Sequence, residues 1–378
     1  FNAAKMRRSR QRINDLNFFN KVVIEREESS TPDKTNVKVE VEEKSTGSLN
    51  LGLGFSTDSG PLLDVTLRER NLLGKGQSLS LSTTLAAEKS SINMSVTEPY
   101  FLNRDITAGF DLFHTARNLQ STRSYNSVNT GFGLRGGYSL SELLRQSWVY
   151  RLEYSEIKDI ASTASQLIKA QKGERYLSQV GHALSYDARD SKITPTDGFA
   201  TRLNNDLAGI GGDIFYLRNV LSAAQYYPLA TGWILSASGK TGHILGLGED
   251  VEIADRFFLG GNNLRGFASA GVGPRDKSTE DSLGGEWMYH GGIELTMPLG
   301  LPDELGITGR VFTDVGSLFS VSPSSSNVVD SATPRAAVGA GVGWLSPFGP
   351  INVDLGWAVL KEDLDETEVF RLNFGTRF

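Results

Sequence analysis

The sequence predicts an all-β protein, an antiparallel transmembrane β-barrel preceded by a fragment of a small α/β domain. Its segments alternate apolar and polar side chains over about ten or more residues, whereas strands of globular proteins are typically roughly five or six residues long. About sixteen such segments follow one another between Ser48 and Phe378, an even number in the bacterial outer-membrane range. Aromatic residues gather near segment ends, as in interfacial girdles, at Tyr100, Phe101, Tyr226, Tyr227, Trp344, Trp357 and Phe378.

The composition of the 378-residue chain fits such a barrel and excludes other classes of protein. Mean hydropathy is -0.24, because a membrane strand turns only every second side chain toward lipid. No apolar run reaches the roughly 18 residues that a membrane-spanning helix requires. The lack of cysteine excludes disulfides and thiolate metal sites, and the net charge of -6 argues against nucleic acid as a partner. We expect no cofactor and no metal.

Residues 1–46 differ from the rest of the chain. Ala3 to Leu16 has the pattern of a helix with a thin apolar stripe, and residues 21–27 and 36–43 alternate as two strands. One helix and two strands are too small a core to stand alone, so we interpret this region as the end of a small α/β domain. Its first residues are not a signal peptide, so an exported chain would have lost one together with anything upstream.

Residues 47–378 form the predicted barrel. Apolar and small polar residues alternate strictly in the first strand, Ser48 to Ser56, in residues 351–359, and in the last strand, Phe370 to Phe378. A strand that ends the chain on an aromatic residue needs a neighbour, and the first strand is the one available. The alternation therefore predicts a closed barrel whose last strand meets its first.

The longest connection, near 247–284, is expected to fold into the barrel. Residues 256–267 contain Gly260, Gly261, Arg265 and Gly266 together with apolar side chains that suit a packed environment better than water, namely Phe257, Phe258, Leu259, Leu264 and Phe267. The lumen wall can supply the surface against which such a loop packs.

Two carboxylates are expected opposite this loop. By the alternation of faces, Glu294 falls on the lumen face of residues 288–298, and Phe312 and Asp314 fall on the lumen face of residues 307–316. Two inward carboxylates need a cation, and Arg265 can bind carboxylates in a bidentate manner. The alternative is that Arg310 neutralises Asp314 while Arg265 stays in solvent.

These motifs resemble those of the outer-membrane insertase and two-partner-secretion superfamily, whose barrels have sixteen strands. Residues 264–267 after 258–261 resemble its loop motif, with Leu264 where valine is commoner, and residues 187–198, 310–316 and 346–350 resemble other signatures of its barrel. Residues 68–77 and 97–101 are similar to the BamA branch, outer-membrane protein assembly factors. Residues 8–19 resemble the end of a POTRA domain, which makes residues 1–46 part of the last, periplasmic one.

The resemblance implies a function and a set of site residues. It implies an insertase that folds β-barrel proteins into the bacterial outer membrane, with nascent barrel proteins, accessory lipoproteins and membrane lipid as partners. It also implies that Arg265 of the motif Leu264–Phe267 contacts Phe312, Asp314 and Glu294. The first and last strands would form an openable lateral gate, which we assign to Leu49, Leu51, Gly52, Gly54, Phe374, Gly375 and Phe378. Glycine weakens strands, which suits an interface that parts.

Three alternatives remain open from the sequence. An enzyme is disfavoured because the four histidines lie on separate predicted strands and no Gly-x-Ser-x-Gly motif accompanies them. A passive porin would share the barrel but has no need of a periplasmic domain or an inward loop. A two-partner-secretion pore would share the loop motif and differ in its substrate.

Overall fold

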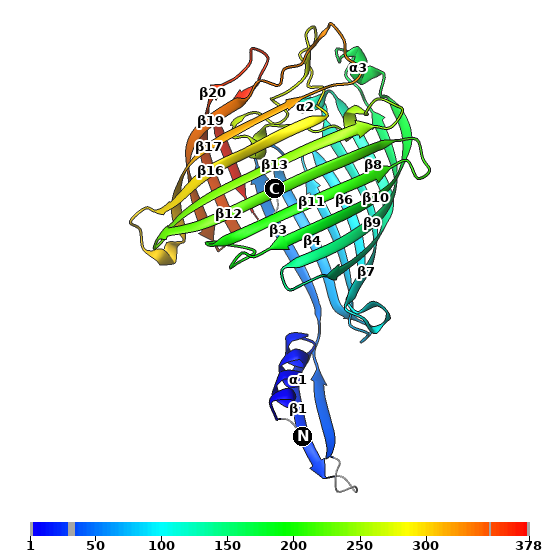
Figure 1. Cartoon of the computed structure of the whole chain (residues 1–378), viewed down its shortest axis with the longest axis vertical. Helices are drawn as coiled ribbons and strands as arrows, with labels where there is room; N and C mark the ends of the chain where they lie inside the picture. Colours follow the sequence, from blue (N-terminus) through cyan, green and yellow to red (C-terminus); the bar gives the residue numbers. More distant parts are fainter. Residues whose placement is uncertain (1–2, 29–34, 348, 376–378) are drawn as a thin grey trace.

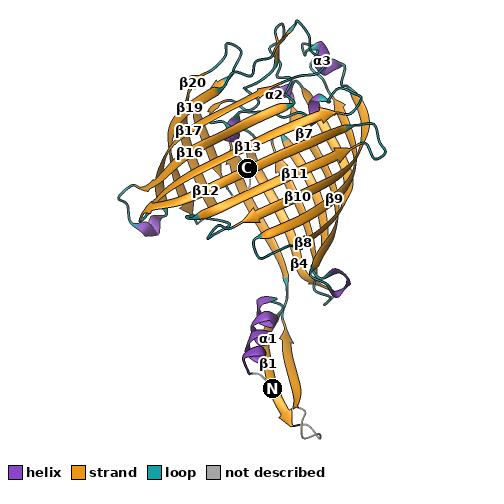
Figure 2. Ribbon diagram, viewed as in Figure 1, coloured by secondary structure: helices purple, strands orange, loops and turns teal. Residues whose placement is uncertain are grey.

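The computed structural model describes residues 3–28, 35–347 and 349–375 and consists of a small module joined to a large barrel (Figures 1 and 2). In the module, helix α1 (Ala3–Asp15) lies against a hairpin of β1 (Phe19–Glu28) and β2 (Thr35–Glu43). Ile24 of β1 is buried, and Arg10 donates to its carbonyl oxygen. The assignment of residues 1–46 to a POTRA domain stays a prediction.

The barrel is closed, antiparallel and sixteen-stranded, so the predicted fold class is confirmed. Neighbouring strands follow chain order around the wall. Its strands are β3 (Gly47–Ser56), β4 (Gly60–Leu72), β5 (Gln77–Ala86), β6 (Lys89–Glu98), β7 (Ile106–Leu119), β8 (Tyr125–Ser139), β9 (Leu144–Lys158), β10 (Gly173–Asp187), β11 (Gly198–Ala208), β12 (Tyr216–Ala230), β13 (Trp233–Gly246), β16 (Trp287–Pro298), β17 (Ile307–Phe319), β19 (Arg335–Ser346), β20 (Gly349–Leu360) and β22 (Phe370–Phe374).

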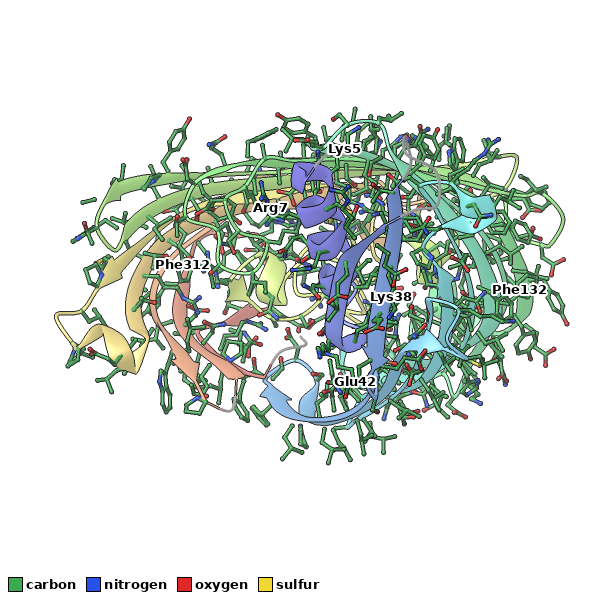
Figure 3. The ribbon with its side chains drawn as sticks, turned by 90° about the horizontal axis from the view of Figure 1, so that it is seen from below. Lys5, Arg7, Lys38, Glu42, Phe132 and Phe312 are labelled. Atoms are coloured by element: carbon green, nitrogen blue, oxygen red, sulfur yellow. The ribbon has the colours of Figure 1, made fainter. Side chains whose placement is uncertain are left out.

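The alternation of side chains separates an apolar outer face from a polar lumen. Outward residues such as Leu51, Leu81 and Ile293 are strongly exposed, as expected of side chains that face lipid. Inward residues bond to one another, and the lumen-facing Asp64 accepts hydrogen bonds from Thr66 and Thr84. In Figure 3 Phe132 projects from the outside of the wall. No helix in the described part of the chain is long and apolar enough to span a membrane.

The two ends of the barrel differ. At the end near the module lie the short turns, which we call the short-turn rim, and one of them carries the 3-10 helix η1 (Phe101–Asn103) (Figure 2). The opposite end carries longer connections with α2 (Gln120–Arg123), α3 (Gln166–Lys169) and β18 (Val328–Val329) (Figure 1). Viewed from below, the module lies across the mouth of the short-turn rim (Figure 3).

Candidate functional site

The connection between β13 and β16 folds into the barrel. It contains η2 (Ile253–Asp255), η3 (Gly261–Asn263), β14 (Gly266–Phe267) and β15 (Arg275–Asp276). Leu264 and Phe267 of the predicted motif have no exposed surface and pack with Leu259, Val272, Met288, Leu318 and Ala337. Met288, Leu318 and Ala337 belong to the wall strands β16, β17 and β19, so the apolar loop side chains are buried against the lumen wall.

Arg265 lies between the two carboxylates that the alternation placed in the lumen. Its Nε and Nη2 donate to Oδ2 and Oδ1 of Asp314 at 2.8 and 2.9 Å, a bidentate pair, and its Nη1 donates to Oε2 of Glu294 at 2.6 Å. The backbone N–H of Arg265 also donates to Asp314. The guanidinium carbon stacks 3.4 Å from the centre of the Phe312 ring. All three predicted partners therefore contact Arg265.

The charge of Arg265 is held firmly at this position. Burial alone would lower the pKa of its guanidinium, but the hydrogen bonds and charges of Asp314 and Glu294 outweigh burial and raise it. Arg310, the alternative partner of Asp314, instead forms a bidentate pair with Asp354 of β20, at 2.8 Å for both bonds. The alternative in which Arg310 neutralises Asp314 and Arg265 stays in solvent is therefore wrong.

Glycines let the loop backbone approach the wall. Gly266 has φ +91, and a Cβ there would lie 2.8 Å from the Cβ of Ala337. A Cβ on Gly356 of β20 would lie 2.8 Å from the backbone nitrogen of Gly266. The motif therefore rests directly on the backbone of the wall near the end of the barrel.

The inward loop also pairs with the connection between β20 and β22. Its strand β14 pairs with β21 (Thr367–Glu368), and the N–H of Ala268 donates to the carbonyl of Glu366. Arg275 of the loop forms an ion pair with the Glu366 side chain at 2.6 Å. The loop is thus joined to the segment that leads into the last strand.

Over the residues that the structure describes, the seam between the last and first strands has the fewest paired residues of any junction in the wall. Only Asn373 with Ser56 and Phe374 with Phe55 are in register, two pairs, whereas β3 and β4 pair along ten residues. Among the described residues, the edge of β3 from Gly47 to Gly54 has no paired neighbour on the seam side. Leu49 and Leu51, predicted gate residues, are 63% and 71% exposed there. The predicted last strand ends at Phe374, and Phe378, like Phe348, lies outside the described residues.

Two of the three predicted seam glycines sit where backbones nearly touch. A Cβ on Gly54 would lie 2.8 Å from the carbonyl oxygen of Phe374. Gly375 has φ +112, and its Cβ would lie 3.0 Å from the carbonyl oxygen of Leu53. Gly52 has ordinary space around it, since its Cβ would lie 3.6 Å from the nearest atom, in Asp64. Gly54 and Gly375 are therefore required by the close crossing of the strands rather than by the inward loop.

A polar cluster closes the long-loop end of the seam, and the sequence reasoning did not assign it. Arg371 of β22 forms an ion pair of 2.6 Å with Asp58, in the turn after β3. It also pairs with Glu368 and donates to the carbonyl of Phe267 in the loop motif. Asn373 accepts from Ser56 and donates to Asn262. The alternation of the last strand places Arg371 and Asn373 on its inward face, but their partners Asp58, Ser56 and Asn262 are far away in sequence.

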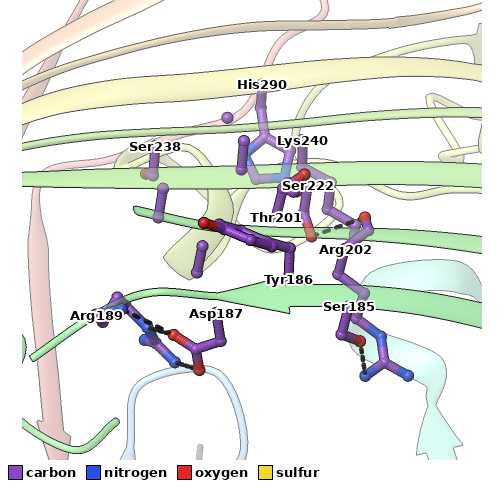
Figure 4. Close-up of a pocket in the computed structure, with 14 residues that line it drawn as sticks. Ser185, Tyr186, Asp187, Arg189, Thr201, Arg202, Ser222, Ser238, Lys240 and His290 are labelled. Carbon is purple, nitrogen blue, oxygen red and sulfur yellow. Dashed lines mark hydrogen bonds and ion pairs between the residues drawn. The ribbon is translucent and has the colours of Figure 1, made fainter. Parts of the chain in front are cut away.

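A pocket lined by both polar and apolar residues lies on the opposite lumen wall (Figure 4). It has a volume of about 440 Å³, and strands β10 to β13 and β16 line it. Arg189 forms an ion pair with Asp187, and Arg202 donates to Ser185. Lys240 and His290 complete its basic lining.

Comparison with known proteins decides the family. Residues 71–378 match the model of the Omp85 superfamily domain. The chain belongs to the Omp85 superfamily. Its bacterial relatives, which are named outer membrane protein assembly factors, together with the barrel place this Omp85 chain in the bacterial outer membrane.

Relatives and solved structures of the Omp85 chain agree with this. It is 33% identical over 380 residues to the outer membrane protein assembly factor BamA of Neorickettsia risticii, covering 100% of this chain and 51% of that protein. The crystal structure of BamA from Haemophilus ducreyi lacking POTRA domains 1–3 superimposes with a TM-score of 0.90 at 20% identity, covering 98% of this chain and 78% of that one. CdiB from Acinetobacter baumannii gives a TM-score of 0.60 at 12% identity, over 98% and 67%. The chain spans about half the length of the curated relatives it matches.

Proposed function

We propose that this chain is the barrel part of an insertase that folds β-barrel proteins and inserts them into the outer membrane. The observation that carries the proposal is the seam between β22 and β3, where, among the described residues, two pairs are in register and the edge of β3 from Gly47 to Gly54 has no paired neighbour. Relatives named as outer membrane protein assembly factors support it. Its partners are then unfolded outer-membrane barrel proteins and lipid, and accessory lipoproteins of an assembly complex.

The barrier to inserting a β-barrel lies in its backbone. Each unpaired N–H or C=O group that enters lipid costs several kcal/mol, so an isolated strand cannot cross the membrane. The free edge of β3 offers a row of such groups to which a client strand can bond by β-augmentation before it meets lipid. Parting Ser56 and Phe55 from Asn373 and Phe374 extends that edge along the whole strand. The seam is then the lateral gate, and no nucleotide or catalytic group takes part.

The inward loop has a defined place in this proposal. Arg265 ties it to β16 and β17, and its strand β14 ties it to the segment that leads into β22. The loop therefore supports the last strand from inside while the pairing across the seam is short. An inward loop held by buried ion pairs favours this function over a passive porin, whose lumen conducts solutes.

A cross-linking experiment during client insertion tests the proposal. The full-length protein is placed in phospholipid vesicles, an unfolded outer-membrane barrel protein is added, and its folding is followed by heat-modifiable gel mobility. A photoreactive residue at Leu51, on the free edge, should cross-link to the client. The matched position is Leu81, which also faces lipid but lies on β5, paired on both sides. Equal cross-linking at both positions, or no acceleration over empty vesicles, would refute the insertase. Export of a soluble passenger instead would identify a secretion pore.

A further inference from the structure

Two exposed leucines on the short-turn rim have an unfavourable backbone conformation. Leu73, between β4 and β5, has φ 54, and Leu102, between β6 and β7, has φ 56. The left-handed region suits glycine and asparagine, whereas a branched apolar side chain is strained there. Among the described residues, these are the only leucine, isoleucine, valine or aromatic residues with positive φ.

Packing within the chain does not explain these leucines. Leu73 is 83% exposed and Leu102 is 73% exposed. The next residue in each turn, Gly74 and Asn103, is of a type that tolerates the same conformation without strain. A strained side chain that contacts little of its own protein indicates a contact outside it.

The position of both turns indicates what that contact is. Each turn lies just beyond strands whose outward side chains face lipid, such as Leu67 of β4 and Leu112 of β7. The η1 turn lies at the lower end of the barrel wall in Figure 2. The tips of both turns are therefore at the level where acyl chains end and headgroups begin.

The neighbouring residues have the composition of a membrane interface. Beside Leu102 lie Tyr100 and Phe101, 56% and 44% exposed, and aromatic residues concentrate at this depth in membrane proteins. Each turn also carries an exposed cation close to its leucine, Lys75 and Arg104. No ion pair involves these two cations in the described part of the chain. Apolar tips with adjacent cations complement phospholipids, whose phosphates lie above their acyl chains.

We propose that these two turns anchor the short-turn rim in the membrane leaflet on the module side. Leu73 and Leu102 insert among the acyl chains, and Lys75 and Arg104 lie at the phosphates. A cavity of about 570 Å³ between these turns and Leu16 and Phe18 of the module leaves room for lipid beside them. Exposed aliphatic residues on other short turns, including Ile193 and Leu140, extend the same contact around the rim. The anchor is independent of the proposed insertase activity.

Site-specific fluorescence tests the anchor directly. Because the chain has no cysteine, Leu73→Cys and Leu102→Cys each give one labelling site for an environment-sensitive fluorophore. The full chain is placed in phosphatidylcholine–phosphatidylglycerol vesicles that contain doxyl-labelled lipid. Leu81→Cys on the lipid-facing wall and Glu42→Cys, exposed on β2 of the module, are the lipid and water controls. We expect quenching at Leu73 and Leu102 to approach that at Leu81.

Two other outcomes would overturn the proposal. Quenching no greater than at Glu42 would place both turns in water. If the fluorophores at positions 73 and 102 become shielded from water only when an unfolded barrel protein is added, the two turns form a peptide-binding surface instead. A second variant keeps the test independent of labelling at the leucines themselves. With the fluorophore at Lys75→Cys, Leu73→Asn should keep the barrel folded, since asparagine accepts this conformation, but lose the doxyl quenching. Unchanged quenching after Leu73→Asn would also refute the proposal that these turns insert into the membrane.

Discussion

Arg371 on the last strand and Asp58 after the first strand form an ion pair of 2.6 Å across the barrel seam. The Arg371 side chain is 3% exposed and also donates to the carbonyl of Phe267, in the inward loop. One guanidinium therefore joins the first hairpin, the last strand and the loop motif. Because the ladder beside it has two residue pairs within the described part of the chain, this ion pair contributes a large share of the described contacts across the seam.

Removing the charge of Asp58 should loosen the seam at its long-loop end. Asp58→Asn replaces a charged acceptor of the buried Arg371, and we expect a loss of about 1–3 kcal/mol in local stability. Hydrogen exchange at the amides of Phe55 and Thr57 should accelerate. The matched control is Asp111→Asn, which breaks the Arg135–Asp111 pair between strands paired along their whole length. Equal acceleration in both variants, or in neither, would contradict the assignment.

Replacing Arg265 should release the inward loop. Arg265→Ala leaves Glu294 and Asp314 without their cation, and breaking a buried ion pair on one side costs about 3–5 kcal/mol. Cleavage of the loop by added protease should become faster. Arg265→Lys keeps the charge but cannot form the bidentate pair with Asp314, so it should give an intermediate rate. Wild-type protection in Arg265→Ala would show that apolar packing alone holds the loop.

The close approach between the loop and the wall gives a steric prediction. A Cβ at Gly356 would lie 2.8 Å from the backbone nitrogen of Gly266, so Gly356→Ala should displace the loop motif. Gly52→Ala is the matched substitution on a lumen-facing strand position, where the nearest atom lies 3.6 Å away. We expect the loop to be cleaved faster in Gly356→Ala than in the unchanged protein. Gly52→Ala should leave the cleavage rate unchanged. The reverse order, or protection of both, would exclude the close backbone contact.

Asp255, in η2 outside the strands, should make stability depend on pH. Burial raises its pKa to about 6, opposed by Arg218 and reinforced by Glu153. Since this exceeds the unfolded value of about 3.9, the folded state binds the proton more tightly, and stability falls as pH rises from about 4 to 6. Asp255→Asn should therefore raise the free energy of unfolding at neutral pH by up to about 3 kcal/mol and have little effect near pH 4. Urea unfolding in detergent micelles measures both.

Asp190 serves as a control of opposite sign. Hydrogen bonds from Thr196, first its hydroxyl and then its N–H, lower the pKa of Asp190 to about 2. Its contribution to stability is present above the unfolded value of about 3.9 and is lost as pH falls toward 2. Asp190→Asn should therefore destabilise the protein at neutral pH, with no difference at the acid end. Parallel pH profiles for the two variants would contradict both assignments.

Strict alternation made the barrel and the inward carboxylates predictable from sequence. The period of two places Glu294 and Asp314 in the lumen independently of the loop conformations. A nearby cationic side chain must then neutralise the two carboxylates. Alternation cannot give the partners of residues on strands that meet late in the chain. Arg310 therefore remained a candidate for Asp314, because its pairing with Asp354 depends on the neighbouring strand β20. The Arg371–Asp58 pair depends on closure of the whole barrel and was not predicted for the same reason.

A disulfide across the seam tests most directly whether β3 and β22 part during client insertion. Ser56→Cys with Asn373→Cys joins the strands at their registered pair in a chain that has no other cysteine. Asn50→Cys with Thr66→Cys joins β3 to β4 at a registered pair and serves as the control. With both barrels folded, the seam disulfide should stop client insertion until reductant is added, and the control should insert clients throughout. Insertion at the normal rate through the locked seam would contradict the lateral gate.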